Sequence, residues 1–267
     1  MTASSVKQLQ NFFSTFSPNA KPLLLLDYDG TLAPFRIDRF RARPWAGVRD
    51  LIHQIQIETS TRIAIITGRP PAEIAPLLGL ALEVWGLHGA ERLYPDGRRD
   101  MEKIPSAARI ALRKLTAQLQ SDSFGALLEL KNNAVVVHWR GASPEKSRAI
   151  AKKARALFAP YAGIASLNLL HFEAGLELRA GRDKGGAVRA ILKEAGAASR
   201  PIAFLGDDLT DEAAFLAVKG RGLSVLVRTG KRKPAADLWL RPPTELRAFL
   251  ESWLQACRSS HTNKSQR

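Results

Sequence analysis

A run of four leucines that ends in two aspartates constrains this 267-residue chain more than any other feature. The stretch LLLLDYDGTLAP starts at Leu23, and its short apolar run is typical of a strand buried on both faces of a sheet. Asp27 and Asp29 follow the run directly, so two carboxylates that repel each other stand at the mouth of a core strand. Something else at this place must compensate that repulsion, because a surface turn would hold both acids at little cost.

The first third of the chain alternates between strand and helix patterns. Residues 63–66 are a second short apolar run, and residues 82–87 are a third predicted strand. Residues 48–55, between the first two runs, carry apolar side chains at helical spacing. This alternation predicts β-α-β units and a parallel sheet.

After about residue 104 the pattern changes to a helix, a strand pair, a second helix and a second strand pair. The predicted segments are 105–119, 126–131 with 134–140, 143–159, and 166–172 with 176–179. Asn132-Asn133 and Glu173-Ala174-Gly175 are the expected turns of the two strand pairs, and Ser143 is the expected helix cap. These segments predict a small α+β unit with an antiparallel sheet.

The first pattern resumes after residue 179, with strands at 202–205, 223–227 and 237–240 between helices. The chain therefore reads as one α/β domain into which a smaller unit is inserted. The predicted domains are a core at 1–104 and 180–257, a cap at 105–179, and a polar tail at 258–267 that we expect to be disordered.

Polar residues follow several of the predicted core strands. They are Asp27 and Asp29 after the first strand, Thr67 and Gly68 after the second, and Asp207, Asp208 and Asp211 after the strand at 202–205, with Lys184 opening the preceding helix. In open α/β sheets ligands bind beyond the carboxyl ends of the strands, so these groups should meet at one edge. Converging carboxylates are tolerated around a hard divalent cation such as Mg²⁺. A carboxylate can also attack phosphorus while a second acid exchanges a proton, which predicts phosphoryl-transfer chemistry.

The order DxDGT, TGR, Lys-Gly and GDDxxDE resembles the haloacid dehalogenase superfamily of phosphotransferases over nearly the whole chain. The resemblance implies a Rossmann-like core with a parallel sheet and an inserted α+β cap with an antiparallel sheet. It implies that Asp27 is the nucleophile and Asp29 the general acid/base, and that Thr67, Gly68 and Lys184 bind phosphate. It further implies a Mg²⁺ ion held by Asp27, the Asp29 backbone carbonyl and Asp207, with Asp208 and Asp211 in the outer shell.

The inserted unit narrows the resemblance to the trehalose-6-phosphate phosphatases. The similar stretches are GLHGAER at 86–92, LELK and HWR in the first strand pair, and GLELRAGRDKG at 175–185. They imply a Mg-dependent phosphomonoester hydrolase of trehalose biosynthesis, which releases phosphate from trehalose 6-phosphate through an aspartyl-phosphate. The cap residues that would grip the glucose hydroxyls are Glu129, Lys131, Arg140 and Glu177.

Some features are left open by this resemblance. Trp139 stands where the family usually has tyrosine, and Ala180 where proline commonly follows the ELR element. The sequence assigns no role to His88 and Glu91, and a structural turn explains them equally well. The resemblance also makes a trehalose-6-phosphate synthase a candidate partner.

Two alternatives differ from this interpretation. A related phosphatase of sucrose 6-phosphate or mannosyl-3-phosphoglycerate would share the core motifs, so only the cap residues favour trehalose. A catalytically dead regulatory or nucleic-acid-binding scaffold would use the formal net charge of +15. Such scaffolds typically lose the nucleophile or the metal-binding aspartate, whereas Asp27 and Asp207 are both present.

Composition and charge limit the other kinds of partner that we expect, namely nucleic acids and membranes. The 40 Lys and Arg residues are scattered and form no known nucleic-acid module, so we expect no nucleic-acid partner. No stretch approaches the ~20 apolar residues of a membrane span, so no membrane partner is expected. The single cysteine, Cys257, cannot form an internal disulfide, which favours the reducing cytoplasm.

Overall fold

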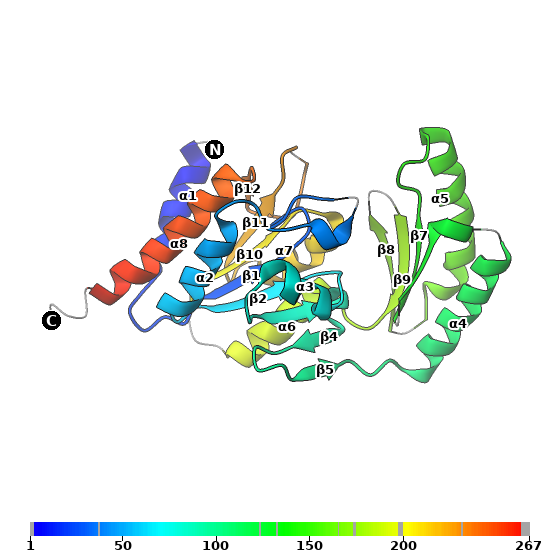
Figure 1. The fold of residues 1–267 in the computed structure, drawn as a ribbon, viewed down its shortest axis with the longest axis horizontal. Coiled ribbons are helices and arrows are strands. Elements are labelled where there is room, and N and C mark those ends of the chain that lie inside the picture. Colours follow the sequence, from blue (N-terminus) through cyan, green and yellow to red (C-terminus); the bar gives the residue numbers. More distant parts are fainter. Residues whose placement is uncertain are drawn as a thin grey trace. The chain divides into compact units, whose positions relative to one another are not determined.

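The computed structural model describes residues 3–262, apart from residues 37, 123, 132, 165, 173–174, 197–199 and 231. The chain forms two compact units (Figure 1). One unit spans Met101–Asp183, and the other is built from the chain on either side of it. Each unit has its own sheet and its own hydrophobic core.

The first unit contains an eight-stranded sheet in the order β12-β11-β10-β1-β2-β3-β4-β5. The six strands from β12 to β3 are parallel, and β4 pairs antiparallel with β3. Their bounds are β1 (Leu23–Leu26), β2 (Arg62–Ile66), β3 (Glu83–Gly86), β4 (Glu91–Leu93), β5 (Arg99–Met101), β10 (Ile202–Gly206), β11 (Leu223–Val227) and β12 (Leu238–Leu240). The predicted parallel sheet is confirmed, and β4 and β5 extend it beyond the prediction.

Strand β1 is buried on both faces, which explains its uninterrupted leucines. Leu24 and Leu26 pack in the core with helices α1, α2, α3 and α8, whereas Leu23 and Leu25 pack on the other face with α6 and α7. These helices are α1 (Ala3–Phe13), α2 (Val48–Glu58), α3 (Pro71–Leu78), α6 (Lys184–Ala195), α7 (Glu212–Val218) and α8 (Thr244–Thr262). Because side chains alternate along a strand, a strand covered by two helical layers needs apolar residues at every position.

The second unit pairs a four-stranded antiparallel sheet with two helices on one face. The strand order is β6-β7-β9-β8, with bounds β6 (Leu128–Lys131), β7 (Ala134–His138), β8 (Leu167–Phe172) and β9 (Gly175–Ala180). Helices α4 (Ser106–Ser121) and α5 (Pro144–Phe158) pack against side chains of β7 and β9 such as Val137 and Leu178. The predicted α+β architecture is confirmed.

Several local predictions can be compared directly. Ser143 caps α5 by accepting a hydrogen bond from the Lys146 N–H. Asn132 and the pair Glu173-Ala174, which belong to the two predicted turns, lie outside the described residues. Short 3₁₀ turns complete the structure at η1 (Arg39–Arg41), η2 (Leu87–Gly89), η3 (Gly125–Leu127), η4 (Ala159–Tyr161) and η5 (Leu209–Asp211).

Helix α8 continues to Thr262, so the first residues of the segment expected to be a disordered tail are helical. Arg258 in this extension forms an ion pair with Glu58 at the end of α2, which ties the last turns to the first unit. Residues 263–267 lie outside the described part of the chain. None of the described helices is long and apolar enough to cross a membrane.

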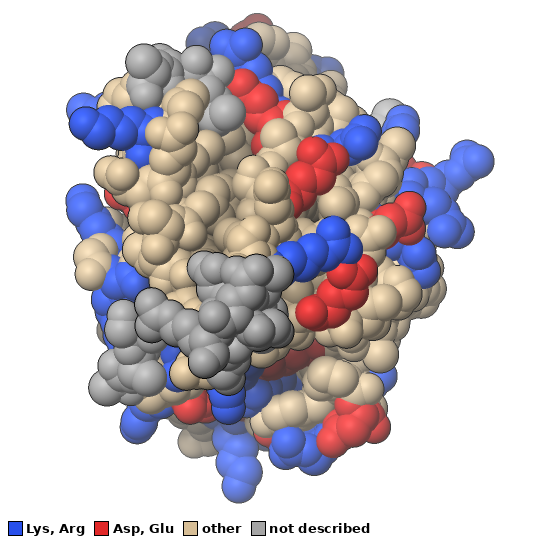
Figure 2. Space-filling model, turned by 90° about the vertical axis from the view of Figure 1, so that its left-hand side faces the viewer, with Lys and Arg blue, Asp and Glu red and all other residues tan. Residues whose placement is uncertain are grey.

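One face of the molecule (Figure 2) shows how some of its basic residues are distributed. On the face drawn in Figure 2, Lys and Arg side chains stand mainly around the edge, and uncharged and acidic residues separate them. Among the described residues that Figure 2 shows, the basic side chains are therefore interspersed with other residues.

Packing of α6 against α7 generates a prediction about the residue next to Lys184. A Cβ added at Gly185 would lie 2.5 Å from the backbone carbonyl oxygen of Ala213, which cannot swing aside. We expect Gly185→Ala to lower the free energy of unfolding by about 1–3 kcal/mol, as overpacking does, measured by chemical denaturation. Gly163→Ala is the control, because no described atom lies within 4 Å of its added Cβ. Equal stability of the two variants would contradict the prediction.

Candidate active site

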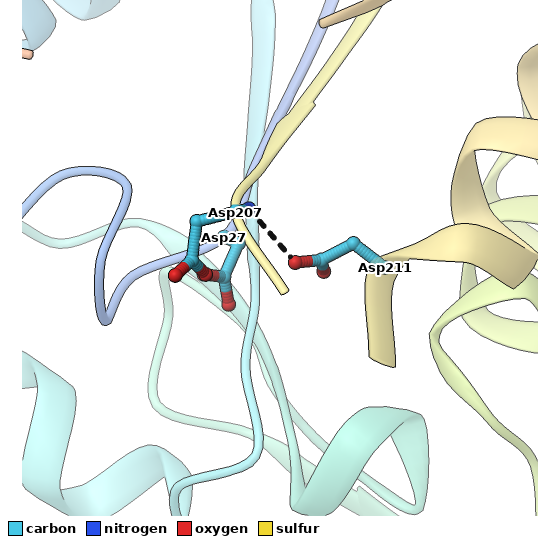
Figure 3. Close-up of side chains that lie close together, drawn as sticks. All are labelled: Asp27, Asp207 and Asp211. Atoms are coloured by element: carbon cyan, nitrogen blue, oxygen red, sulfur yellow. Dashed lines mark hydrogen bonds between the residues drawn. The ribbon is translucent and has the colours of Figure 1, made fainter. Parts of the chain in front are cut away.

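Three buried aspartates converge beyond the carboxyl ends of β1 and β10 (Figure 3). Asp27 and Asp207 are the first residues after these neighbouring parallel strands, and Asp211 approaches from η5. The three side chains are 3%, 6% and 0% exposed, and each offers an oxygen within 4.8 Å of the others. Figure 3 shows the carboxylates of Asp27 and Asp207 side by side, with that of Asp211 turned toward the Asp207 backbone. The prediction that acidic side chains meet at this edge of the sheet is confirmed for Asp27, Asp207 and Asp211.

Lys184 connects two of these acids. Its Nζ donates hydrogen bonds of 2.6 Å to Oδ1 of Asp27 and of 2.6 Å to Oδ1 of Asp211. Burial by itself would lower the pKa of Lys184, but the adjacent carboxylates of Asp211 and Asp27 outweigh it and raise the pKa above its usual range. The side chain is therefore a fixed ammonium in the middle of the acidic cluster.

The pKa values of two of these acids, Asp27 and Asp207, are raised above the ordinary value of an aspartate. Burial raises the pKa of Asp27 from 3.8 to about 7, opposed by the Lys184 ammonium and reinforced by the charge of Asp211. Burial, together with the charges of Asp27 and Asp211, raises the pKa of Asp207 well above 3.8. A bound divalent cation would reverse this repulsion, and a donor set of carboxylate oxygens is the kind that Mg²⁺ prefers. The residues present therefore fit such an ion.

Asp208 and Asp211, both predicted for the outer shell, have different surroundings. The Oδ2 of Asp211 accepts hydrogen bonds of 3.0 Å from the backbone N–H groups of Asp207 and Asp208. The carboxylate of Asp208 instead accepts from the Leu209 N–H at 2.7 Å and caps η5. Asp211 thus orders the loop that carries Asp207, while Asp208 begins the next turn.

Asp29, the predicted acid/base, lies in an ion pair that the sequence did not indicate. Nε of Arg69 donates to Oδ2 of Asp29 at 2.5 Å, and Nη2 donates to Oδ1 at 2.6 Å. Arg69 belongs to the TGR motif, but a partnership with Asp29 follows only from β1 and β2 being neighbours. Gly30 comes next in a left-handed conformation (φ +81°), where any Cβ would collide with the Asp207 carboxylate. The glycine of DxDGT is therefore required by close packing.

The predicted phosphate-binding group Thr67 is buried at the end of β2, next to Gly68. The Thr67 hydroxyl accepts a hydrogen bond of 3.2 Å from the Arg69 N–H. The sequence did not indicate a role for the hydroxyl of Thr31, because threonine is common in turns. Thr31, the last residue of DxDGT, donates a hydrogen bond of 3.2 Å to Oδ2 of Asp27 and so orients the predicted nucleophile.

The structure supplies a contact for His88, whose role the sequence left open. Leu87 and His88 both have positive φ angles, 49° and 59°, and the His88 N–H donates to the Thr67 carbonyl oxygen at 2.8 Å. The imidazole lies against Gly68, since a Cβ there would stand 2.7 Å from Nε2. The loop after β3 therefore supports the Thr67-Gly68 turn. Glu91 starts β4 and is 3.6 Å from Arg99 of β5.

In the second unit, three of the four predicted sugar-binding residues share one face of the sheet. Register pairs Glu129 with Val136 and Val136 with Glu177, and Lys131 lies two residues beyond Glu129 on the same side. Nζ of Lys131 is 3.6 Å from Oε2 of Glu177. Oε2 of Glu129 forms a hydrogen bond of 2.7 Å with Nε2 of His138.

Arg140, the fourth of these residues, does not lie on the sheet. The prediction of a strand through residue 140 is wrong by two residues, because β7 ends at His138. A turn closed by the Ala142 N–H and the Trp139 carbonyl oxygen follows, with Gly141 at a φ of +77°. Arg140 is exposed in that turn and does not share the face of Glu129.

Comparison with known proteins gives a consistent result. The family model of trehalose-phosphatases matches residues 25–240. A trehalose-phosphate phosphatase of Mycobacterium marinum is 32% identical over 243 residues, covering 86% of this chain and 60% of that protein. A trehalose 6-phosphate phosphatase of Zea mays is 30% identical over 253 residues, covering 85% of this chain and 68% of its own length. The chain thus spans about 60% of the length of the mycobacterial relative.

Solved structures agree on the fold. The C-terminal domain of a Candida albicans trehalose-6-phosphate phosphatase has a TM-score of 0.75 at 21% identity, covering 94% of this chain and 96% of that chain. A trehalose-6-phosphate phosphatase related protein has a TM-score of 0.62 at 27% identity, covering 87% and 97%. A haloacid dehalogenase-like hydrolase from B. subtilis has a TM-score of 0.62 at 16% identity, covering 86% and 99%.

The pairing of Lys184 generates a stability prediction. Asp211→Ala would leave the buried ammonium with one of its two carboxylate partners and two backbone N–H groups without their acceptor. We expect the free energy of unfolding to fall by about 3–5 kcal/mol in chemical denaturation, as it does when a buried ion pair loses one member. Asp50→Ala on the exposed start of α2 is the control and should cost less than about 1 kcal/mol. A similar small loss in both variants would mean that the Lys184 network does not stabilise the fold.

The raised pKa of Asp27 generates a prediction about pH and metal. Folding raises this pKa, so the metal-free protein holds an extra proton between pH 3.8 and about 7, and its stability falls as pH rises through that window. A cation must displace that proton below about pH 7 but not above it. We therefore expect Mg²⁺ to raise the melting temperature more at pH 8 than at pH 6. The difference should shrink in Asp27→Asn, and equal shifts at both pH values in the unaltered protein would contradict the prediction.

Proposed function

The chain belongs to the trehalose-phosphatase family, and from that premise we propose that it is a Mg²⁺-dependent hydrolase that converts trehalose 6-phosphate to trehalose and phosphate. The observation that carries the proposal is the buried cluster of Asp27, Lys184, Asp207 and Asp211 at the end of β1 and β10. Such a cluster is costly unless a cation and a phosphate group use it.

Asp27 is the proposed nucleophile. One of its carboxylate oxygens forms a bond to phosphorus while the bond from phosphorus to the sugar oxygen breaks, which yields an aspartyl-phosphate and the free sugar. The Lys184 ammonium at 2.6 Å and the Thr31 hydroxyl at 3.2 Å hold the carboxylate in orientation. Lys184 also opposes the burial that would otherwise protonate Asp27, and a protonated carboxyl is a poor nucleophile.

Asp29 is the proposed acid/base. It gives its proton to the departing sugar oxygen, and in the second step it takes a proton from the water that attacks phosphorus and releases the Asp27 carboxylate. In the structure both of its oxygens accept hydrogen bonds from Arg69, so the acid role requires that this contact opens and that Asp29 takes up a proton before the first step. Thr67 and Gly68, at the end of the adjacent strand, and Lys184 are the proposed ligands of the phosphoryl oxygens.

Asp27, the Asp29 backbone carbonyl and Asp207 are the proposed Mg²⁺ ligands, with Asp208 and Asp211 in the outer shell. When bound, the ion would neutralise negative charge on the phosphate group and on the aspartates. The raised pKa of Asp207 supports this assignment, because a carboxylate that repels its neighbours gains most from a cation.

The second unit is proposed to select the sugar. Glu129, Lys131 and Glu177 on one sheet face, and Arg140 in the turn after β7, are the proposed partners of the glucose hydroxyls. Buried polar groups discriminate among sugars because a wrong sugar leaves them unpaired. The cytoplasm is the proposed location, in line with one buried free cysteine, and a trehalose-6-phosphate synthase is the candidate partner.

The proposal predicts phosphate release from trehalose 6-phosphate in the presence of Mg²⁺ and background release in excess chelator. The assay compares it with sucrose 6-phosphate, mannosyl-3-phosphoglycerate and p-nitrophenyl phosphate. Trehalose 6-phosphate should have the highest kcat/KM of the sugar phosphates. Preference for another sugar phosphate would move the substrate assignment to that relative, and no release from any compound would indicate a catalytically dead scaffold.

Two variants separate the chemistry from the choice of sugar in the same assay. Asp27→Asn should reduce turnover of every compound to background, because an amide is a poor nucleophile. Lys131→Ala should reduce kcat/KM for trehalose 6-phosphate by about 10- to 100-fold, the cost of one charged hydrogen bond, and should spare p-nitrophenyl phosphate. Equal loss on both compounds would mean that Lys131 supports the fold of the second unit and not the sugar.

A further inference from the structure

Arg179 on β9 is a buried cation with hydrogen-bond donors that the described part of the protein leaves unmet. The residue is 1% exposed, yet no residue in the described ranges accepts a hydrogen bond from its Nε or Nη1. Burial lowers the pKa of Arg179 from its usual range, while Glu177 and Asp183 act in the opposite direction. A guanidinium has five N–H donors, and leaving them unmet in a buried place is costly.

Strand register puts Arg179 into a regular arrangement with the proposed sugar-binding residues. Lys131, Ala134 and Arg179 lie directly across one another on β6, β7 and β9. The next row on the same face contains Glu129, Val136 and Glu177 in the same strand order. From ordinary strand spacing and rise, the four charged residues stand at the corners of a rectangle roughly 10 Å by 7 Å.

The rest of this face suits a ligand. The middle strand contributes only Ala134 and Val136 between the charged corners, and Nζ of Lys131 approaches Oε2 of Glu177 to 3.6 Å across it. The helices of the unit pack on the opposite face, against residues such as Val135 and Leu178. Three of the four charged residues thus already have a charged or polar neighbour on this face, Glu129 with His138 and Lys131 with Glu177, whereas Nε and Nη1 of Arg179 have no acceptor among the described residues.

The charges indicate the chemical class of that ligand. Two carboxylates and two cations give a formal net charge of zero, which favours an uncharged molecule over a phosphate or a metal ion. The carboxylates only accept hydrogen bonds, and the ammonium and guanidinium only donate them. A sugar hydroxyl does both. Neighbouring hydroxyls can therefore donate to a carboxylate and accept from a cation of this face.

We propose that Arg179 is a further specificity-determining residue, whose unmet N–H groups donate to hydroxyls of the sugar. The inference rests on the proposed function for the identity of the substrate as a sugar phosphate. It adds to the predicted set the one residue of the rectangle that the sequence motifs did not single out. It also accounts for the burial of an arginine whose Nε and Nη1 have no acceptor among the described residues.

The experiment combines stability with substrate choice in the full chain. In Arg179→Met the apolar side chain replaces a buried charge, so the melting temperature should stay the same or rise. The kcat/KM for trehalose 6-phosphate should fall by about 10- to 100-fold, mainly through KM, because charged hydrogen bonds to the sugar are lost. The kcat/KM for p-nitrophenyl phosphate, which has no sugar, should not change.

Two further variants complete the test. Arg179→Lys keeps the charge but loses the planar fork of donors, so it should lose less activity on trehalose 6-phosphate than Arg179→Met. Arg148→Met, exposed on α5, is the matched control and should change neither the melting temperature nor either activity. A lower melting temperature in Arg179→Met with equal loss on both compounds would assign the residue to folding and overturn the proposal.

Failure of the proposed function would give a different result. If the unaltered protein prefers another sugar phosphate, the trehalose assignment fails, but the role of Arg179 stands if Arg179→Met loses that sugar selectively. If Arg179→Met keeps full activity on the preferred sugar phosphate, the inference about Arg179 is wrong while the phosphatase assignment survives. If the unaltered protein does not distinguish any sugar phosphate from p-nitrophenyl phosphate, the inference is also wrong.

Discussion

The first unit depends on one buried ammonium between two carboxylates. Lys184 reaches Asp27 and Asp211 at 2.6 Å each, and Asp211 in turn holds the backbone of the loop that carries Asp207. When all are ionised, the three carboxylates and one ammonium of this cluster leave two negative charges. A divalent cation carries the matching charge, so the same arrangement that orders the loop also provides the electrostatic reason for a metal ion. The opening stretch of leucines and aspartates is tolerated because this compensation exists.

The polar groups of the two units differ in their balance of charge. The acidic cluster of the first unit has an excess of negative charge, which suits a cation and, through it, a phosphate group. The polar sheet face of the second unit balances Glu129 and Glu177 against Lys131 and Arg179, which suits a neutral polyol. In the proposed function, chemistry and choice of substrate therefore belong to separate sheets. On that proposal, a change in the sheet of the second unit would alter substrate preference without altering the reaction.

Prediction from sequence succeeded where burial leaves a strong local pattern. The strands β1, β2, β10 and β11 are apolar at nearly every position because helices cover both faces, and all were located from that property. The short strands β4 and β5, the last two in the sheet order, were not located, since three residues with few apolar side chains carry no distinct periodicity. The same weakness placed the end of β7 two residues too late, at Arg140.

The sequence by itself determined which side chains stand at the ends of core strands, and therefore that Asp27, Asp29, Thr67 and Asp207 meet at one sheet edge. Only the tertiary structure decided which of them touch. The pair of Asp29 with Arg69, the contact of His88 with Gly68, and the row that joins Lys131 to Arg179 all depend on strand order and register. The physical reason is that a local pattern records whether a face is buried, whereas neighbours across a sheet are fixed by packing between segments far apart in the chain.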